Sequence, residues 1–283
     1  MARVGYLLYA VHSNQTVDFM TSSIRFTHAI TRRPSTSIIE GLRAADTGNP
    51  DIDLFREHHS LYVAALRAAG AKVTELSEIE FLPDSVFVED TALCLKEGAI
   101  IMRPGAPSRL DEAAAIAPAL MNRFDDVQEI ENGHVEGGDI LVTGREIIVG
   151  RSARTDDEGI AELRKLAGKW GYTVRELQTP PEVLHFKTDC GLLDEDTILS
   201  TARLAETGCF DDYKVLLVAE GEEACANAVR FNDVVLFPAG FPKTAELLRK
   251  EGFELVEIPN TEAAKVDGGM SCLSLRFTPT TDI

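Results

Sequence analysis

A cysteine near the C-terminal end of the 283-residue chain stands in a context that suits a nucleophile. Residues 266–277 read VDGGMSCLSLRF, so a carboxylate, two glycines and small residues precede the thiol of Cys272 and an apolar alternation follows it. Glycines permit close approaches and backbone conformations that side chains forbid. A thiol after such a loop, at the start of a strand, can face a pocket. Free cysteines are nonetheless most often buried as small hydrophobic side chains, so both interpretations of Cys272 stay open.

Polar side chains interrupt three other apolar runs. Residues 81–90 read FLPDSVFVED, residues 135–139 read VEGGD and residues 183–189 read VLHFKTD. Each polar group has an ordinary structural alternative. Asp84 follows a proline and could serve a turn, and Asp139 could cap the glycine pair before it. Glu89 and Asp90 could form a solvated strand end, and His185 could be a satisfied core histidine.

These residue types together narrow the chemistry. A cysteine and a histidine that holds or relays its proton make a nucleophile and its base. A carboxylate such as Glu136 can orient that histidine and stabilise its cationic form. Further carboxylates at Asp84 and Asp90 would repel the oxyanion of acyl transfer, but they suit a substrate with positive charge at the reacting carbon. A planar guanidinium with several N–H donors matches paired carboxylates.

Composition and missing motifs exclude other classes of function. The net charge of −18 argues against nucleic acid and favours a cationic ligand, although acidic surfaces also aid solubility. No apolar run is long enough to span a membrane. There is no HExxH, P-loop or complete GxGxxG motif, and no CxxC pair, so we expect no metal or organic cofactor. The five cysteines form no disulfide framework and no leader segment is recognisable, which predicts a reduced, cytoplasmic protein.

The chain contains a structural repeat, in which two apolar runs joined by a polar turn precede a helix and a strand. Gly, Asn and Asp in the turns are typical of hairpins. The first complete unit comprises 91–95, 99–102, a helix at 108–124 and a strand at 126–130. The second comprises 140–142, 147–149, 156–170 and 173–177. The third comprises 191–193, 198–200, a short or irregular helix and 214–219, and the fourth 228–231, 234–237, 243–251 and 254–258.

A fifth unit is split between the ends of the chain. Residues 272–277 supply one hairpin arm, and 25–31 supply the other, followed by a helix at 54–69 and a strand at 72–76. Pairing the first and last segments closes the repeats into a ring and removes exposed sheet edges. The sequence therefore predicts one α/β domain over 25–283, with 1–24 as an N-terminal extension. Equivalent ends of the repeats meet near the ring axis, where distant polar residues can converge.

These residues resemble a known family, the dimethylarginine dimethylaminohydrolases of the pentein, or guanidine-modifying, superfamily. The matching stretches are FLPDSVFVEDTALC, RPGAPSRL, HVEGGDILVTGREIIVGRSART, VLHFKTD and KVDGGMSCLSLRF. Their presence in this order over about residues 25–277 is specific, whereas any one alone would be weak. The resemblance implies a five-bladed α/β propeller of ββαβ repeats around a pseudo-fivefold axis, with a central active site.

The resemblance also implies roles for particular residues. Cys272 resembles the nucleophile, His185 the residue that protonates the departing amine and then activates water, and Glu136 its carboxylate partner. The expected substrate contacts are Asp84, Glu89 and Asp90 toward the guanidinium and amine, Arg109 and Arg154 toward the substrate carboxylate, and Val266 and Leu42 through their main chain and a loop over the site. Leu42 lies in the segment that matches least.

The activity implied is hydrolysis of asymmetric dimethylarginine or monomethylarginine to citrulline and dimethylamine or methylamine, through a covalent S-alkylthiouronium on Cys272. Two alternatives stay open. One is an arginine deiminase or another ureido or guanidino hydrolase with the same residues. The other is a non-catalytic protein that binds an arginine derivative. A small cationic substrate is the expected partner, with neither nucleic acid nor membrane, and a homodimer stays open.

Overall fold

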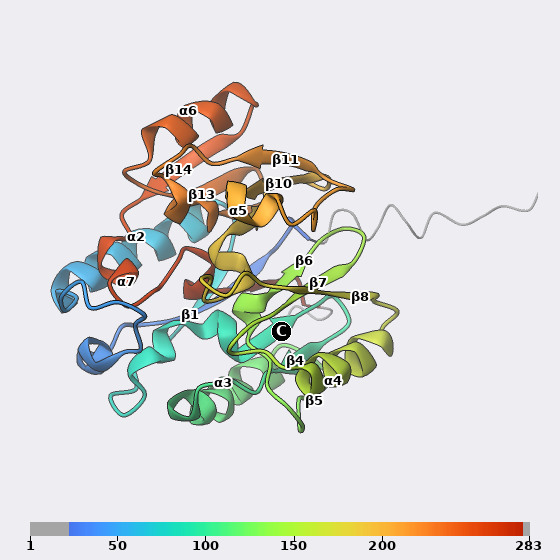
Figure 1. The fold of residues 1–283 in the computed structure, drawn as a ribbon. Helices are drawn as coiled ribbons and strands as arrows, with labels where there is room; N and C mark the ends of the chain where they lie inside the picture. Colours follow the sequence, from blue (N-terminus) through green and yellow to red (C-terminus); the bar gives the residue numbers. More distant parts are fainter. Residues whose placement is uncertain (1–22, 280–283) are drawn as a thin grey trace, which may run out of the picture.

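Five small sheets surround a central axis in the computed structural model, which describes residues 23–279 (Figure 1). Each sheet has three strands, in the orders β15-β1-β2, β3-β4-β5, β6-β7-β8, β9-β10-β11 and β12-β13-β14. The helices α2, α3, α4 and α6 lie around the outside of the ring in Figure 1. The five-bladed α/β propeller expected from the repeat is confirmed.

Each blade is a hairpin followed by a helical crossover to a parallel outer strand. The strands of the first sheet are β15 (Leu275–Phe277), β1 (His28–Arg32) and β2 (Lys72–Leu76), with α2 (Ile52–Ala68) as its crossover. The next has β3 (Ala92–Cys94), β4 (Ala99–Ile101), α3 (Leu110–Met121) and β5 (Val127–Glu129). Then come β6 (Ile140–Val142), β7 (Ile147–Arg151), α4 (Asp157–Gly168) and β8 (Val174–Gln178). The last two contain β9 (Cys190–Leu192), β10 (Thr197–Ser200), α5 (Ala202–Ala205) and β11 (Lys214–Leu217), and β12 (Val229–Phe231), β13 (Val234–Pro238), α6 (Pro242–Lys250) and β14 (Glu254–Ile258).

The blade built from both ends of the chain closes the ring. β1 pairs antiparallel with β15, with Ile30 opposite Leu275, and pairs parallel with β2. The buried hydroxyl groups of Tyr62 on α2 and Ser274 lie 2.7 Å apart, which ties the crossover helix to the C-terminal arm. Ile24 is buried, and its carbonyl accepts a hydrogen bond from the Asn232 amide. The predicted N-terminal extension lies outside the described residues, apart from positions 23 and 24.

Five short 3-10 turns lead into the innermost strands of the blades. They are Val88–Thr91 before β3, Gly137–Asp139 before β6, Phe186–Thr188 before β9, Glu223–Ala226 before β12, and Ser271–Leu273 before β15. These turns occupy equivalent places in the repeat, so the ring brings them together around its axis. Asp90, Asp139 and Cys272 lie within such turns, and His185 directly precedes one.

The predicted elements agree with the observed ones apart from small shifts at their ends. One difference concerns the thiol: the sequence placed Cys272 at the start of a strand, but it is the middle residue of a 3-10 turn, and β15 begins at Leu275. The short helix expected in the third unit is confirmed as α5. None of the helices in the described range combines the length and the apolar character that a membrane crossing requires.

The blade of β15, β1 and β2, which joins the two ends of the chain, should contribute strongly to the stability of the fold. Replacing the buried Ile30 by alanine leaves a cavity in the sheet that joins the two chain ends, and we expect a loss of about 2–5 kcal/mol in the free energy of unfolding. The matched Ile39→Ala change at a 41% exposed position should cost under about 0.5 kcal/mol. Urea unfolding of both variants measures the difference. Equal midpoints would contradict the role of this blade.

Candidate active site

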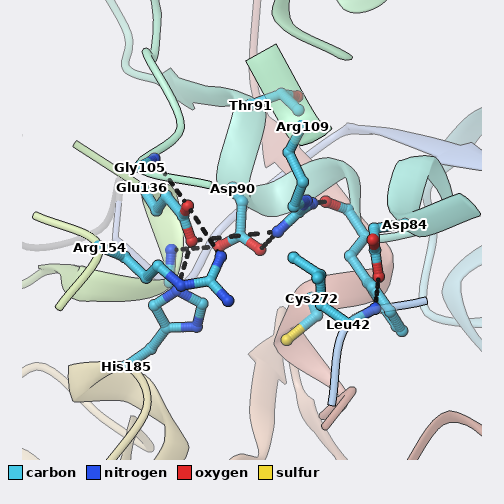
Figure 2. A network of polar contacts seen from close by, with 12 residues as sticks. Leu42, Asp84, Asp90, Thr91, Gly105, Arg109, Glu136, Arg154, His185 and Cys272 are labelled. Atoms are coloured by element: carbon cyan, nitrogen blue, oxygen red, sulfur yellow. Dashed lines mark hydrogen bonds and ion pairs between the residues drawn. The ribbon is translucent and has the colours of Figure 1, made fainter. Parts of the chain in front are cut away.

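A small cavity of about 30 Å³ lies among the polar residues singled out in the sequence. Among the residues that line it are Asp84, Asp90, Arg109, Arg154, His185 and Cys272. Leu42, Val266, Asp267 and Gly268 contribute to its wall as well. Figure 2 shows the labelled polar side chains and Cys272 converging from separate parts of the ring, with the sulfur of Cys272 on the same side as the His185 ring. Nine of the ten predicted site residues line this cavity or bind a residue that does.

The two glycines before Cys272 serve close packing. A Cβ on Gly268 would lie 2.3 Å from the Phe87 ring, and one on Gly269 would lie 2.4 Å from the Asn227 side chain. The left-handed backbone conformation falls on Asp267, with φ of 58°. The amide of Gly269 points at the Cys272 sulfur, at 3.4 Å. The glycine pair therefore lets the loop fold tightly against the neighbouring blades and aims one donor at the thiol.

Ser271 anchors the cysteine turn from the opposite side. Its hydroxyl donates to Glu89 Oε2 at 2.6 Å, and its amide donates to Asn227 Oδ1 at 2.8 Å. Glu89 Oε1 also lies 2.6 Å from both Lys187 Nζ and Arg276 Nη2. Burial alone would raise the pKa of Glu89, but these two cations outweigh it and lower that pKa. The buried carboxylate of Glu89 thus binds three groups beside the turn that carries Cys272.

His185 and Glu136 form a buried ion pair, with 2.6 Å between Nε2 and Oε2. Burial disfavours the imidazolium, but Asp90, the hydrogen bond to Glu136 and the charge of Asp139 together raise the pKa of His185. Burial also opposes the charge on Glu136, yet the hydrogen bond and charge of His185 lower its pKa. These directions favour a carboxylate at Glu136 and an imidazolium at His185, a form in which His185 can donate a proton.

The ring of His185 is held in place by the VEGGD segment. A Cβ on Gly138 would lie 2.9 Å from Nδ1 of His185, so only glycine leaves room for the imidazole there. The Asp139 carboxylate accepts the Phe186 amide at 2.8 Å and the Ser152 hydroxyl at 2.6 Å. Asp139 thus fixes the residue after His185, and the interpretation of Asp139 as a cap for the glycine pair is wrong.

Burial and nearby carboxylates favour the protonated thiol of Cys272 in the absence of a ligand. Burial contributes most, followed by Glu89 and Asp90, and together they raise the pKa of Cys272 to about 12. The amide of Gly269 and the ammonium of Lys187 act in the opposite direction. A cation placed in the cavity would lower the thiol pKa, because opposite charge stabilises the thiolate.

Asp90 and Asp84 present the negative charge of the cavity. Asp90 accepts the Gly138 amide at 2.8 Å and Arg109 Nη1 at 2.7 Å, and it is 2% exposed. Asp84 accepts the Leu42 amide at 3.0 Å, and burial raises its pKa. Asp84 is the second residue of the 3-10 turn Pro83–Val86, so its turn role and its place in the cavity coexist. The solvated strand end proposed for Glu89 and Asp90 is wrong because both are buried.

Arg109 is committed to protein groups. It donates from Nη1 to Asp90, from Nη2 to the Phe87 carbonyl, and from both Nε and Nη2 to Glu112 Oε2. Arg154 is the more accessible of the two cations, with 19% of its side chain exposed, and its Nη1 lies 3.5 Å from Glu136 Oε1. Arg154 can therefore meet an anionic group of a ligand, while Arg109 mainly orders the carboxylates.

Glu112 is a site-associated carboxylate that the sequence analysis missed. It is 2% exposed, and its Oε1 has no hydrogen-bond partner among the described residues. Burial outweighs the neighbouring Arg109 and raises the pKa of Glu112 to about 7. The RPGAPSRLDEA stretch carried a signal for it, since Glu112 lies three residues after Arg109 and such pairs share a helix face.

The wall toward solvent is formed by the segment around Leu42 and by the Val266–Gly268 turn. Leu42 is 37% exposed and Val266 is 3% exposed. The Ala44 amide donates to Asp267 Oδ2 at 2.5 Å, which joins the two segments. Because the cavity is small, a ligand the size of an amino acid requires these segments to separate. Glu89 alone among the predicted contacts does not line this cavity.

One group of side chains has the composition of a metal site. Ligand atoms of Asp90, Glu136 and His185 all lie within 4.8 Å of one another. The Arg109 guanidinium is also 4.0 Å from Glu136 and already balances charge there, and a protonated His185 cannot ligate a cation. The group fits proton transfer better than metal binding.

Comparison with known proteins agrees with this site. A family model described as arginine deiminase matches residues 68–216. Solved structures of the N-terminal domain of ArgZ, a cyanobacterial arginine dihydrolase, superpose with a TM-score of 0.79 at 21% identity and cover 90% of this chain and 97% of that one. That likeness shows the fold. The ring with its central cysteine, histidine and carboxylates defines a guanidine-modifying enzyme of the pentein class.

Within that class the chain belongs to the N(G),N(G)-dimethylarginine dimethylaminohydrolase family. It is 37% identical to the Pseudomonas aeruginosa enzyme of that name over 254 residues, covering 89% of this chain and all of the relative. The Streptomyces coelicolor enzyme is 34% identical, over 88% of this chain and 96% of its own. A cysteine-to-serine variant of the Pseudomonas enzyme, in complex with citrulline, superposes with a TM-score of 0.87 at 36% identity, covering 89% of this chain and all of the other.

Removing the charge of Glu112 should weaken ligand binding. With Glu112→Gln, Arg109 loses one of its carboxylate partners and competes more strongly with a ligand cation for Asp90. We expect affinity for a guanidino ligand to fall about tenfold, the effect of roughly one charged hydrogen bond. Calorimetry in a Cys272→Ser background measures binding without turnover. Glu222→Gln, at a carboxylate that is 7% exposed and binds the amides of Lys243 and Thr244, is the matched control. An unchanged affinity in Glu112→Gln would contradict the role.

Alkylation of Cys272 should follow its raised pKa. Because the thiolate is the reactive form, the rate with iodoacetamide should rise about tenfold per pH unit between pH 7 and 9 without a plateau. Glutathione, with an ordinary thiol pKa, is the control and should begin to level off near the upper end of this range. Peptide mapping by mass spectrometry separates Cys272 from the other cysteines. A plateau for Cys272 below pH 8 would show that the thiolate is stabilised in the free protein.

Proposed function

We propose that this protein hydrolyses Nω-methylated arginines, asymmetric dimethylarginine and monomethylarginine, to citrulline and dimethylamine or methylamine. The observation that carries the proposal is one cavity lined by a thiol, an imidazolium paired with a carboxylate, and two further carboxylates. The Pseudomonas relative is a dimethylarginine dimethylaminohydrolase, and a solved structure of its cysteine-to-serine variant holds citrulline. A solved dimethylarginine dimethylaminohydrolase variant, 36% identical to this chain, forms an adduct with S-methyl-L-thiocitrulline.

The reaction begins when the substrate cation enters the cavity. Asp90 and Asp84 bind the guanidinium N–H groups, and the positive charge lowers the pKa of Cys272 so that its proton is released to water. The thiolate attacks the guanidinium carbon and forms a C–S bond. His185 then donates its proton to the methylated nitrogen as the C–N bond breaks, and the neutral amine leaves. An S-alkylthiouronium on Cys272 remains.

The second half of the reaction reverses the role of His185. Neutral His185 accepts a proton from water as the oxygen attacks the thiouronium carbon. As this adduct collapses, the C–S bond breaks and the hydroxyl proton of the adduct passes to the departing sulfur, so that neutral citrulline is released and Cys272 returns to the thiol form. Glu136 keeps the same contact throughout and stabilises the imidazolium at both ends of the cycle. Every proton and leaving group is accounted for by water and these side chains.

Substrate recognition divides between two groups of residues. Asp84 and Asp90 are the proposed guanidinium contacts. Glu89 is proposed to act indirectly, by accepting the hydrogen bond of Ser271 and so holding the turn that carries Cys272. Arg154 is the proposed contact for the substrate carboxylate, and Arg109 holds Asp90 in position. The main chain at Leu42 and Val266 is proposed to contact the substrate amino-acid group when the segments over the cavity close.

Arginine deimination is the second candidate, and the match to the arginine deiminase family model favours it. Both reactions use the same thiol, histidine and carboxylates, and they differ in the nitrogen that leaves. We further propose a cytoplasmic location, because all five cysteines are free thiols.

A substrate panel tests the activity. Asymmetric dimethylarginine, monomethylarginine, arginine and citrulline are incubated with the protein, and citrulline, alkylamine and ammonia are measured. We expect both methylated substrates to be turned over in preference to arginine. Preference for arginine, with release of ammonia, would favour the second candidate. Cys272→Ser should abolish turnover, and acid-quenched wild-type protein should carry the added mass of the amidino intermediate on Cys272. Full turnover by Cys272→Ser would rule out the covalent mechanism.

A further inference from the structure

A second, much larger cavity of about 590 Å³ occupies the ring axis behind the candidate active site. Its walls come from the innermost strand of every blade, β3, β6, β9, β12 and β15, through residues such as Leu93, Ile140, Leu192, Val229 and Leu275. Pockets of this size accommodate ordinary small molecules. Eight of the ten predicted site residues line the other cavity, and only Glu89 lines this one, so the family's activity does not require this space.

A single layer of residues separates the two cavities. Neighbours in sequence face opposite ways: Asp90 and Cys272 line the small cavity, whereas Glu89 and Ser271 line the large one. His185 belongs to the small cavity and Lys187 to the large one. None of the residues that the structure describes lines both cavities, so a ligand on the axis would be distinct from the substrate.

The large cavity is cationic in a strongly acidic protein. Among residues 23–279, five basic residues line it and Glu89 is the sole acidic one, although the chain carries a net charge of −18. The basic residues are Arg25, Lys96, Lys187, Arg230 and Arg276. Such a concentration of one sign of charge in a concave site attracts ions of the opposite sign.

The floor of this cavity carries positive charge that the surrounding side chains do not balance. Lys187 and Arg276 share the single carboxylate of Glu89, each at 2.6 Å, which leaves one net positive charge. Lys187 is 8% exposed. Among the described residues, Glu89 is the only acceptor for its ammonium, which has three donors. Buried cations are normally fully paired, so this arrangement suits an added anion.

The walls above that floor are apolar. Leu93, Ile140, Leu192 and Leu275 are largely buried and belong to the inner strands that face the axis. An inorganic anion would balance the charge of Lys187 and Arg276 but would leave these apolar walls in contact with water. A molecule with an anionic head and an apolar body would satisfy both, because burial of apolar area favours its binding.

We propose that the axial cavity is a binding site for an amphiphilic organic anion, a carboxylate or sulfonate on an apolar body. The anionic group lies at Lys187 and Arg276, and the apolar body lies against the inner strands. Lys96 and Arg230 add attraction along the wall. The proposal is independent of the proposed function, since it requires neither Cys272 chemistry nor a guanidino substrate.

Fluorescence titration of the full-length protein with 8-anilinonaphthalene-1-sulfonate tests the site. We expect saturable enhancement with one probe per chain. Decanoate should displace the probe, whereas decylammonium, which has the same apolar chain and the opposite charge, should not. Inorganic phosphate should displace it weakly. Equal displacement by decanoate and decylammonium, or the absence of saturable binding, would overturn the proposal.

Variants locate the probe. Lys187→Met should weaken probe binding at least tenfold, and circular dichroism reports whether the variant folds. The double change Lys96→Gln and Arg230→Gln leaves the floor intact and should weaken binding severalfold, which keeps the test decisive if Lys187→Met is unfolded. Phe81→Ser removes the most exposed large apolar side chain among the described residues, which is 80% exposed and lies outside the cavity. This change should leave the affinity for the probe unaltered. Loss of binding in Phe81→Ser alone would place the probe on the surface and refute the site.

Discussion

The carboxylate of Glu89 is the interaction on which the centre of the ring depends. It binds Lys187, Arg276 and Ser271 in one buried cluster, so it joins three of the five blades at the axis. A buried carboxylate is tolerated only with such compensation, because its desolvation is costly. The cluster holds the turn that carries Cys272, and it separates the substrate cavity from the axial cavity. Its loss would disturb both cavities together.

Buried charged groups of both signs surround the candidate active site. Asp84, Asp90, Glu112 and Glu136 lie near Arg109, Arg154 and His185, and buried cations and carboxylates set one another's protonation. Burial with Glu89 and Asp90 raises the pKa of Cys272, and Asp90 also acts with Glu136 and Asp139 to raise the pKa of His185. A guanidinium ligand supplies the positive charge that favours the thiolate. In the proposed reaction, formation of the Cys272 thiolate therefore depends on the arrival of a cationic substrate.

Much of the architecture could be predicted from the sequence because each repeat carries its own local signals. Apolar runs around polar turns predicted the hairpins, and the periodic helices and outer strands followed them. The closure of β1 on β15 was also predictable, since unpaired sheet edges are unfavourable. The 3-10 turn at Cys272 was missed because a three-residue turn has no periodicity. Glu112 was missed because its one signal, the three-residue spacing from Arg109, is also common between exposed charges on a helix surface.

The sequence by itself determined the repeat, the residue types of the site and their family resemblance, since these depend on local pattern and on motifs in order. Only the tertiary structure decided how those residues face. Asp90 and Glu89 are adjacent, yet they line different cavities, and Arg109 is directed at protein carboxylates. Orientation, burial and charge balance arise from contacts between blades that are distant in sequence. For that reason the axial cavity and its cationic floor have no signature in any one segment of the chain.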